Sequence, residues 1–274
     1  MARSTKGSRG RAWAAAPVGW TASFGDLVKF SARVLGELVR GRVFRYLGES
    51  LRQAGVLIVG STVVIWSLCF IIGLNCGIEG AYLQRSVGAP AYAGVFSAWC
   101  DLRELMPYAF GYMMAAKVGT GLVAEIGSMR ITDEIDALEV MGISSMTFLC
   151  GTRLLGAIIT LPFVYLAGIG AGFLASYLAV VQQIGDVSSG GFFLIFWMFQ
   201  NPPDVLYSLI KGMAMALVIV LVGCYYGYTT SGGPVGVGTA TAKSMVVNTV
   251  AVHVIGMVGT QVFWGFNANA PIGG

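Results

Sequence analysis

The side chains in this sequence that could do chemistry are a small set of charged residues, and the acidic ones gather in one stretch. Five of the thirteen Asp and Glu residues lie within residues 118–142. Ile131, Ile135 and Leu138 stand at i, i+4 and i+7, which predicts a short amphipathic helix over residues 131–141. On its opposite side, carboxylates recur about one turn apart and would offer an acidic face to a partner. This acidic face consists of Asp133, Asp136 and Glu139, with Glu134 at its edge.

The predicted helix over residues 131–141 is about ten residues long, which is too short to cross a bilayer. Gly142 follows it at the position where a left-handed residue commonly closes a helix. A solvated helix in a loop between two membrane spans would show the same spacing. The spacing alone therefore leaves a docking surface and an ordinary loop helix both open.

A second charged pair, Arg103 and Glu104, lies in a predicted span over residues 101–126. Such side chains cost a few kcal/mol each at the bilayer centre, so they should face a protein interior or a wet cavity. Neighbouring residues on a helix point about 100° apart, so the two cannot simply neutralise each other, and at least one needs another partner or water. Either both reach water at the outer membrane interface, or they border a cavity. Pro107, one turn later, predicts a loosened helix there.

Motifs for catalysis are absent from the sequence. It holds no G-x-x-x-x-G-K-[ST] phosphate-binding loop, so the chain is not its own ATP motor by that route. His253, the only histidine, stands in an apolar run and leaves no Ser–His–acid or Cys–His pairing. The five cysteines form no C-x-x-C pair and suggest no metal site. We expect neither an enzyme nor, for want of a motif, a nucleic-acid-binding protein.

The composition predicts an integral membrane protein. Charged residues make up 11% of the chain, whereas soluble domains carry about 25%. Ten of the seventeen Lys and Arg residues lie at or before Arg52, which places the N-terminus in the cytoplasm by the positive-inside rule. Residues 1–22 are basic and expected to be disordered. Residues 24–47 interleave apolar and basic positions, which favours a helix lying in the membrane interface over a soluble helix packed on a partner.

The expected fold is all-α, with this N-terminal interfacial amphipathic helix followed by five transmembrane helices. An odd number of spans leaves the C-terminus outside. The expected spans cover residues 54–74, 101–126, 150–181, 205–228 and 244–266.

The stretch from Leu102 to Ile143 resembles the signature region of the MlaE/YrbE permeases, the membrane subunits of ABC transporters that work with MCE-domain lipid-binding proteins. It contains L-R-E-L-x-P, then G-x-x-L-x-A-E-I-G-x-M-R after a basic residue, and the acidic helix. A second block from Gly223 to Met245, GCYYGYTTSGGPVGVGTATAKSM, resembles the actinobacterial branch. The resemblance extends over most of the chain from about Arg40.

The resemblance implies a permease domain over residues 23–274 with an MlaE-like fold in the plasma membrane. It implies two permease subunits, paralogous or identical, around a lipid cavity, with a cytoplasmic ATPase dimer below and MCE proteins above. No cofactor is expected in this chain, since the partner ATPase would bind ATP and Mg²⁺. Fatty acid, mycolate-type lipid, sterol and phospholipid all remain possible cargoes.

The same resemblance implies roles for particular residues. For the chain as a whole, the alternatives to a transporter permease are a non-transporting scaffold that anchors an MCE assembly and, more remotely, an integral-membrane enzyme. The residues implied in coupling to the ATPase are Glu125, Arg130, Asp133, Glu134, Asp136 and Glu139. The residues implied at the lipid cavity are Arg103, Glu104 and Pro107.

Overall fold

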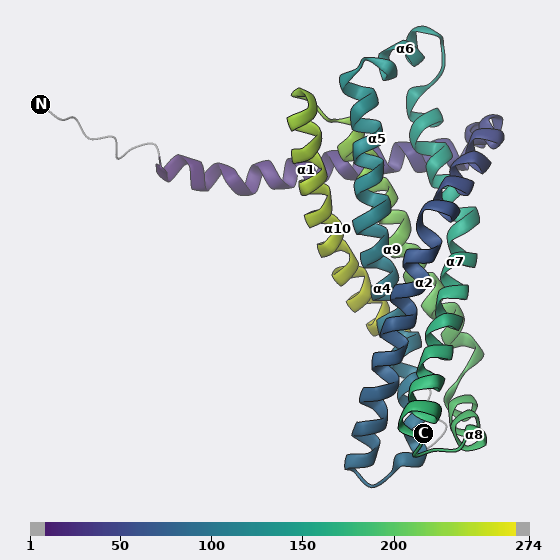
Figure 1. Ribbon diagram of the computed structural model, residues 1–274. Coiled ribbons are helices and arrows are strands. Elements are labelled where there is room, and N and C mark those ends of the chain that lie inside the picture. The colour runs from purple at the N-terminus through teal and green to yellow at the C-terminus, as the bar shows by residue number, and fades with distance from the viewer. Residues whose placement is uncertain (1–8, 267–274) are drawn as a thin grey trace, which may run out of the picture.

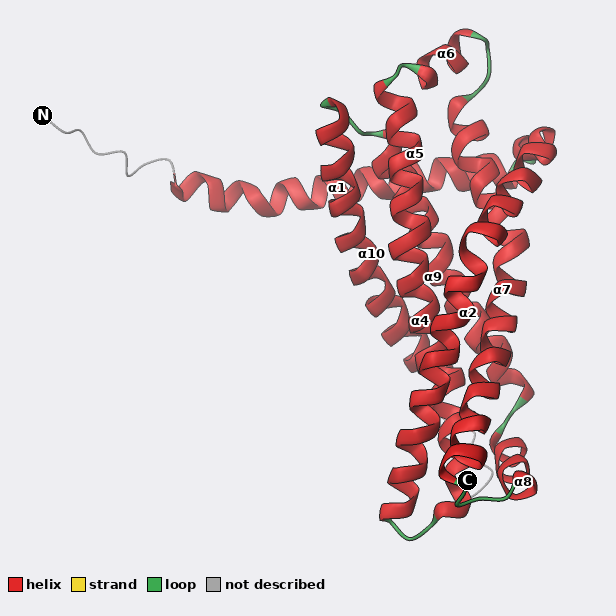
Figure 2. Ribbon diagram, in the orientation of Figure 1, coloured by secondary structure: helices red, strands yellow, loops and turns green. Residues whose placement is uncertain are grey.

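The computed structural model describes the backbone of residues 9–266 and the side chains of residues 23–266. In that part all regular secondary structure is helical, and short loops join the helices (Figure 2). The helices are α1 (Arg9–Val39), α2 (Leu47–Ser86), α3 (Ala93–Phe96), α4 (Met106–Met113), α5 (Thr120–Ile131), α6 (Glu134–Val140), α7 (Thr152–Tyr177), α8 (Ser189–Phe199), α9 (Pro202–Tyr228) and α10 (Gly233–Trp264). Short 3-10 segments are η1 (Arg42–Tyr46) and η2 (Pro90–Tyr92), and π-helical segments are η3 (Ser97–Leu105), η4 (Met114–Gly119), η5 (Met146–Gly151) and η6 (Leu178–Ile184).

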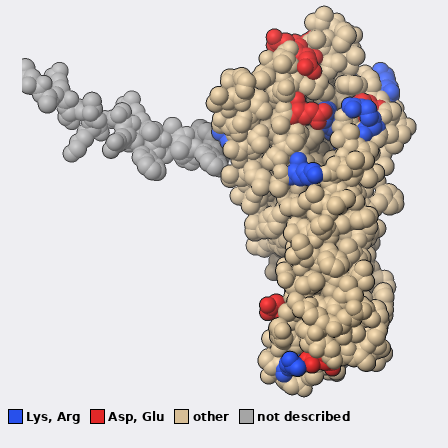
Figure 3. All heavy atoms as spheres, in the orientation of Figure 1, with Lys and Arg blue, Asp and Glu red and all other residues tan. Residues whose placement is uncertain are grey.

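The long helices form an elongated bundle with two distinct ends (Figure 1). The α6 end carries α6 and the turn between α9 and α10, and the α8 end carries α8 and the turn that follows α2. Charged side chains gather toward these ends on the face drawn in Figure 3, and other residues cover the part between them. This distribution is the one expected of a bundle whose middle lies in hydrocarbon.

Four helical stretches in the described residues are long and apolar enough to cross a membrane. Three of the five predicted spans lie within them, and a fourth, residues 244–266, overlaps the last stretch and ends two residues beyond it. The stretches are Arg42–Ser86, Met146–Ile184, Pro202–Tyr228 and Gly233–Trp264.

The remaining predicted span, residues 101–126, is helical but is not among these four stretches. It belongs to an unbroken helical run from Ala93 to Ile131 in which α and π segments alternate. The run lies alongside the other long helices (Figure 1). At Met106 the backbone N–H bonds the carbonyl of Asp101, five residues back, so the loosening predicted near Pro107 takes the form of π-helical turns without a break.

Helix α1 differs from the prediction at both ends. It begins at Arg9, so residues 9–22, expected to be disordered, are helical, while residues 1–8 lie outside the described residues. The alanines at 14–16 favour this extension. The helix ends at Val39, before the expected residue 47, because Gly41 adopts a left-handed conformation (φ +73°). Helix α1 crosses the bundle near its α6 end (Figure 1), and its contact with a membrane stays a prediction.

Close helix contacts depend on glycine at a few positions. A Cβ on Gly73 of α2 would overlap the backbone of Gly172 in α7, so only glycine fits there. Gly223 and Gly227 of α9 likewise face Leu122 and Ile126 of α5. Gly223 and Gly227 stand four residues apart in the sequence, which is the spacing at which small residues let two helices approach closely.

Candidate functional site

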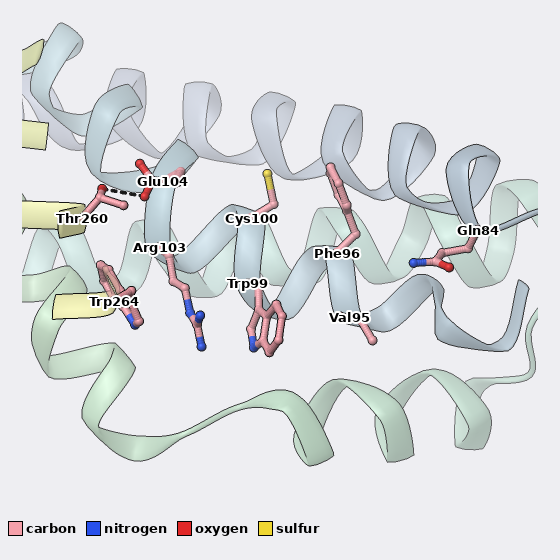
Figure 4. A pocket seen from close by; sticks show the side chains of 9 residues that line it. All are labelled: Gln84, Val95, Phe96, Trp99, Cys100, Arg103, Glu104, Thr260 and Trp264. Atoms are coloured by element: carbon pink, nitrogen blue, oxygen red, sulfur yellow. Dashed lines mark hydrogen bonds between the residues drawn. The ribbon is translucent and has the colours of Figure 1, made fainter. Parts of the chain in front are cut away.

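A cavity of about 360 Å³ lies toward the α8 end, between η3 and the C-terminal parts of α2 and α10 (Figure 4). Arg103 and Glu104 both line it. Pro107 is buried one turn further on and does not line it. The lining residues are Gln84, Val95, Phe96, Trp99, Cys100, Arg103, Glu104, Thr260 and Trp264.

The guanidinium of Arg103 is held by an acidic residue from α9. Its Nη2 and Nε donate to Asp204 Oδ2 at 2.6 and 3.1 Å, and Trp264 Nε1 donates to Asp204 Oδ1 at 2.8 Å. The guanidinium also lies 4.5 Å from the ring centre of Trp99, a cation–π distance. Trp99 and Arg103 project from the same side of η3, with Trp264 beside them (Figure 4).

The carboxylate of Glu104 is bound from two other helices. Lys211 Nζ of α9 donates to Glu104 Oε2 at 2.9 Å, and Thr260 Oγ1 of α10 donates to Oε1 at 2.6 Å. Lys211 Nζ further donates to Thr260 Oγ1 at 2.7 Å and to the carbonyl of Arg103 at 2.9 Å. The Lys211 side chain is fully buried, whereas 36% of the Glu104 side chain remains exposed.

These contacts form two ion pairs that tie η3 to α9, and hydrogen bonds from Thr260 and Trp264 add α10. They show that Arg103 and Glu104 do not neutralise each other and that each has its own partner on α9. The alternative in which both reach interfacial water fails for Arg103, which is 8% exposed. A desolvated charge of this kind is tolerated only with its partner present.

Sequence reasoning missed Asp204 and Trp264 as partners, and noted Lys211 only as a lysine near the end of a span. A signal was present, because Asp204 and Lys211 stand seven residues apart on one helix and therefore share a face two turns apart. Two charges on one face of an apolar helix call for partners on a neighbouring helix.

The predicted acidic helix is shorter than residues 131–141. Helix α6 covers Glu134–Val140, because Asp133 adopts a left-handed conformation (φ 60°) and separates it from α5. Asp is one of the few residues that tolerate this conformation. Ile135 is fully buried, as the apolar stripe requires. The predicted left-handed cap at Gly142 is confirmed by its φ of +78°.

The residues expected to couple to an ATPase differ in the contacts that hold them. Glu125 pairs with the buried Arg153 of α7 at 2.6 Å. Glu139 accepts hydrogen bonds from Ser145 at 2.6 Å and from Tyr228 of α9 at 3.3 Å, which hold it against the bundle.

The exposed acidic surface at α6 consists of Asp133, Glu134, Asp136 and Glu139, of which Glu139 is also hydrogen-bonded to the bundle. Arg130 reaches Asp136 at 2.7 Å and lies beside this surface. Thr132 Oγ1 donates to Glu134 at 3.0 Å and helps to close the short turn.

Polar contacts also fix the end of α1 near the α6 end. Glu37 accepts hydrogen bonds from Arg42 at 2.9 Å and from Thr147 of η5 at 3.2 Å. Burial acts to raise the pKa of Glu37, but these hydrogen bonds outweigh it and hold the pKa below its usual value. The carboxylate is therefore ionised at neutral pH and links α1 to the segment before α7.

An all-helical bundle over the described residues, with several membrane-length apolar helices and with paired charges beside an open cavity, defines a multi-pass membrane protein of the kind that includes transporter permeases. Residues 50–262 match the family described as Permease MlaE. The chain belongs to the MlaE permease family, which confirms the resemblance seen in the sequence.

Individual relatives agree with this placement. A "Probable ABC transporter permease protein" of Rickettsia conorii is 28% identical over 242 residues, which cover 88% of this chain and 92% of the relative. A protein of the same description from Rickettsia bellii is 33% identical over 162 residues, 59% of this chain and 62% of the relative. The "Intermembrane phospholipid transport system permease protein MlaE" of Haemophilus influenzae is 26% identical over 220 residues, 78% of this chain and 82% of the relative.

Proposed function

We propose that this chain is the permease subunit of an ABC transporter that moves lipids across or out of the plasma membrane together with MCE proteins. A separate cytoplasmic ATPase dimer, which binds ATP and Mg²⁺, supplies the energy. The family and the names of its relatives support this assignment. The observation that carries it is the cavity at the α8 end, where one buried and one part-buried ion pair stand beside an apolar wall.

The cavity has the two kinds of surface that an amphipathic ligand needs. Phe96, Trp99 and Trp264 offer aromatic surface to a hydrocarbon chain, whereas Arg103 and Glu104 offer charge to a head group. Its volume of about 360 Å³ lies near the lower limit for small-molecule sites, which is too small for a whole two-chain lipid. We infer that a second permease subunit, a paralogue or a copy of this chain, completes the cavity.

The proposal places the α6 end in the cytoplasm and the C-terminus outside. Helix α1 and α6 lie toward the same end of the bundle (Figure 1), and most of the basic residues precede Arg52. Helix α6 then stands where a cytoplasmic ATPase can reach it. Its exposed carboxylates Asp133, Glu134 and Asp136 would orient the ATPase at this contact, with Arg130 at the side. Glu125 and Glu139 are also exposed and would add to this contact, while Arg153, Ser145 and Tyr228 hold their carboxylates in place.

Changing the cavity charges one at a time tests the proposal. We expect Arg103→Ala and Glu104→Gln each to lower the lipid recovered with the purified complex by about tenfold, since a lost charge-assisted contact of about 1.4 kcal/mol has that effect. Mass spectrometry of the retained lipid gives the measurement and also identifies the lipid.

Two exposed residues of α2 near the α8 end serve as matched controls. Arg85→Ala and Glu79→Gln remove the same kinds of charge outside the cavity and should leave lipid recovery unchanged. Normal assembly with normal lipid loading in both cavity variants would remove the pocket assignment. If ATP hydrolysis by the co-purified ATPase also failed to respond to this subunit, the chain would instead be a scaffold for MCE proteins.

A further inference from the structure

Asp101 is a fully buried acidic residue that the proposed transport site does not use. Asp101, in η3, has no exposed surface, and neither of its carboxyl oxygens has a hydrogen-bond partner among the described residues. It stands next to Cys100 and two residues before Arg103, both of which line the cavity. A fully buried carboxyl without a partner is rare in proteins and needs an explanation.

The surroundings of Asp101 provide no positive charge. Ser97, one turn earlier in η3, is hydrogen-bonded to Ser176 of α7, and Gly77 of α2 packs directly on Ser176. This part of η3 therefore faces a close contact between α2 and α7. From α2 the Cys76 thiol comes near the carboxyl without reaching hydrogen-bond geometry, and a thiol is at most a weak, uncharged donor.

The other titratable groups in the neighbourhood are the thiol of Cys69 on α2, the thiol of Cys100, and Glu104, which already pairs with Lys211. Arg103 holds Asp204 instead. Every arginine of α2 and α7 is likewise paired elsewhere: Arg52 with Glu49, Arg85 with Asp186 and Arg153 with Glu125.

An ionised carboxylate in such a place would lack both water and a counter-charge. The cost of burying it exceeds the cost of binding a proton, so a group in this position becomes neutral. We propose that Asp101 is a proton-binding site: it carries a proton while α2, α7 and η3 are packed as in this structure, and it releases the proton when α2 and η3 separate and water enters.

Proton binding at this position is linked to the packing of the cavity wall. The packed state holds one proton more than any state in which Asp101 meets water, so a lower pH favours the packed state and a higher pH favours separation. Because Cys100 and Arg103 flank Asp101 in the same segment, separation here would also move the cavity wall. This inference concerns the chain alone and does not depend on which lipid or ATPase it serves.

Infrared spectroscopy of the full chain in lipid nanodiscs detects the proton directly. The difference between wild type and Asp101→Asn should show the carbonyl band of a protonated carboxylic acid from about pH 6 to about pH 9. The matched control, Asp133→Asn, changes an exposed aspartate at the α6 end and should instead show carboxylate bands. Carboxylate bands for Asp101 at neutral pH would overturn the proposal.

The pH dependence of unfolding provides a second measurement with a defined sign. Above about pH 4 an aspartate in the unfolded chain is ionised, so unfolding of the wild type must release the proton that Asp101 holds. The ratio of the unfolding equilibrium constants, wild type over Asp101→Asn, should rise about tenfold per pH unit. A ratio that stays constant with pH would refute the site.

A reagent test on the wild type covers the case in which Asp101→Asn fails to insert. A hydrophobic carbodiimide modifies protonated carboxyl groups in apolar surroundings, and peptide mass spectrometry then locates the adduct. Modification of Asp101 is the expected result. An unmodified Asp101 would contradict its assignment as a proton-binding site.

Discussion

Replacing Asp204 with Asn should destabilise the bundle more than any change to an exposed charge at the same end. Asp204 accepts three hydrogen bonds, two from Arg103 and one from Trp264, and its side chain is 1% exposed. In Asp204→Asn the amide offers one acceptor oxygen and directs N–H groups at donors. Arg103 keeps its charge in a place that water barely reaches. We expect a loss of about 3–5 kcal/mol in the free energy of unfolding.

Two other ion pairs provide comparisons for this loss of unfolding free energy. Lys211→Met should lose about 1.5–3 kcal/mol, because Glu104 keeps the Thr260 hydrogen bond and can draw on water. Asp186→Asn removes the exposed pair with Arg85 and should lose only about 0–1 kcal/mol.

The double variant Arg103→Leu with Asp204→Leu removes both charges and should be far less destabilised than the two single losses added together. Unfolding of the purified chain by titration with a denaturing detergent gives these free energies. Equal losses of unfolding free energy in Asp204→Asn and Asp186→Asn would contradict the importance of burial for this pair. So would a loss in the double variant equal to the sum of the two single losses.

Three further outcomes follow from other parts of the chain. Gly73→Ala should destabilise by about 1–3 kcal/mol because its Cβ meets the backbone of α7, whereas Gly60→Ala, with open space around it, should be neutral or slightly stabilising; thermal unfolding compares them. Asp133→Lys combined with Asp136→Lys should release a co-purifying ATPase while membrane insertion stays normal, and full retention of the ATPase would exclude α6 as the dock. A reporter active only in the cytoplasm, fused after Gly274, should stay silent, and activity there would mean an even number of spans.

The sequence predicted those features that depend on neighbouring residues. Apolar runs located four stretches of membrane length, since length and composition alone decide whether a helix can span hydrocarbon. Gly142 was recognised as a helix end because only local backbone geometry is involved, and Ile135 was recognised as buried from the helical period.

Features that depend on contacts distant in sequence were predicted only in outline. The need of Arg103 and Glu104 for outside partners follows from the geometry of one helix. The identity of those partners, Asp204 and Lys211, depends on how η3 packs against α9, which no local pattern encodes. The division between α5 and α6 at Asp133 escaped prediction because a single left-handed residue interrupted an otherwise regular apolar spacing.

The two ends of the molecule are joined by one continuous element. The helical run from Ala93 to Ile131 carries Arg103 and Glu104 at the cavity and Glu125 near α6, and Asp133 ends it. Movement of α6 therefore acts on the same run that forms one wall of the cavity. The π-helical segments η3 and η4 interrupt its regular hydrogen bonding, and such segments are the points where a long helix can shift its register. Since η3 also holds the ion pairs and the buried Asp101, we expect the exchange between packed and open cavity to occur in η3.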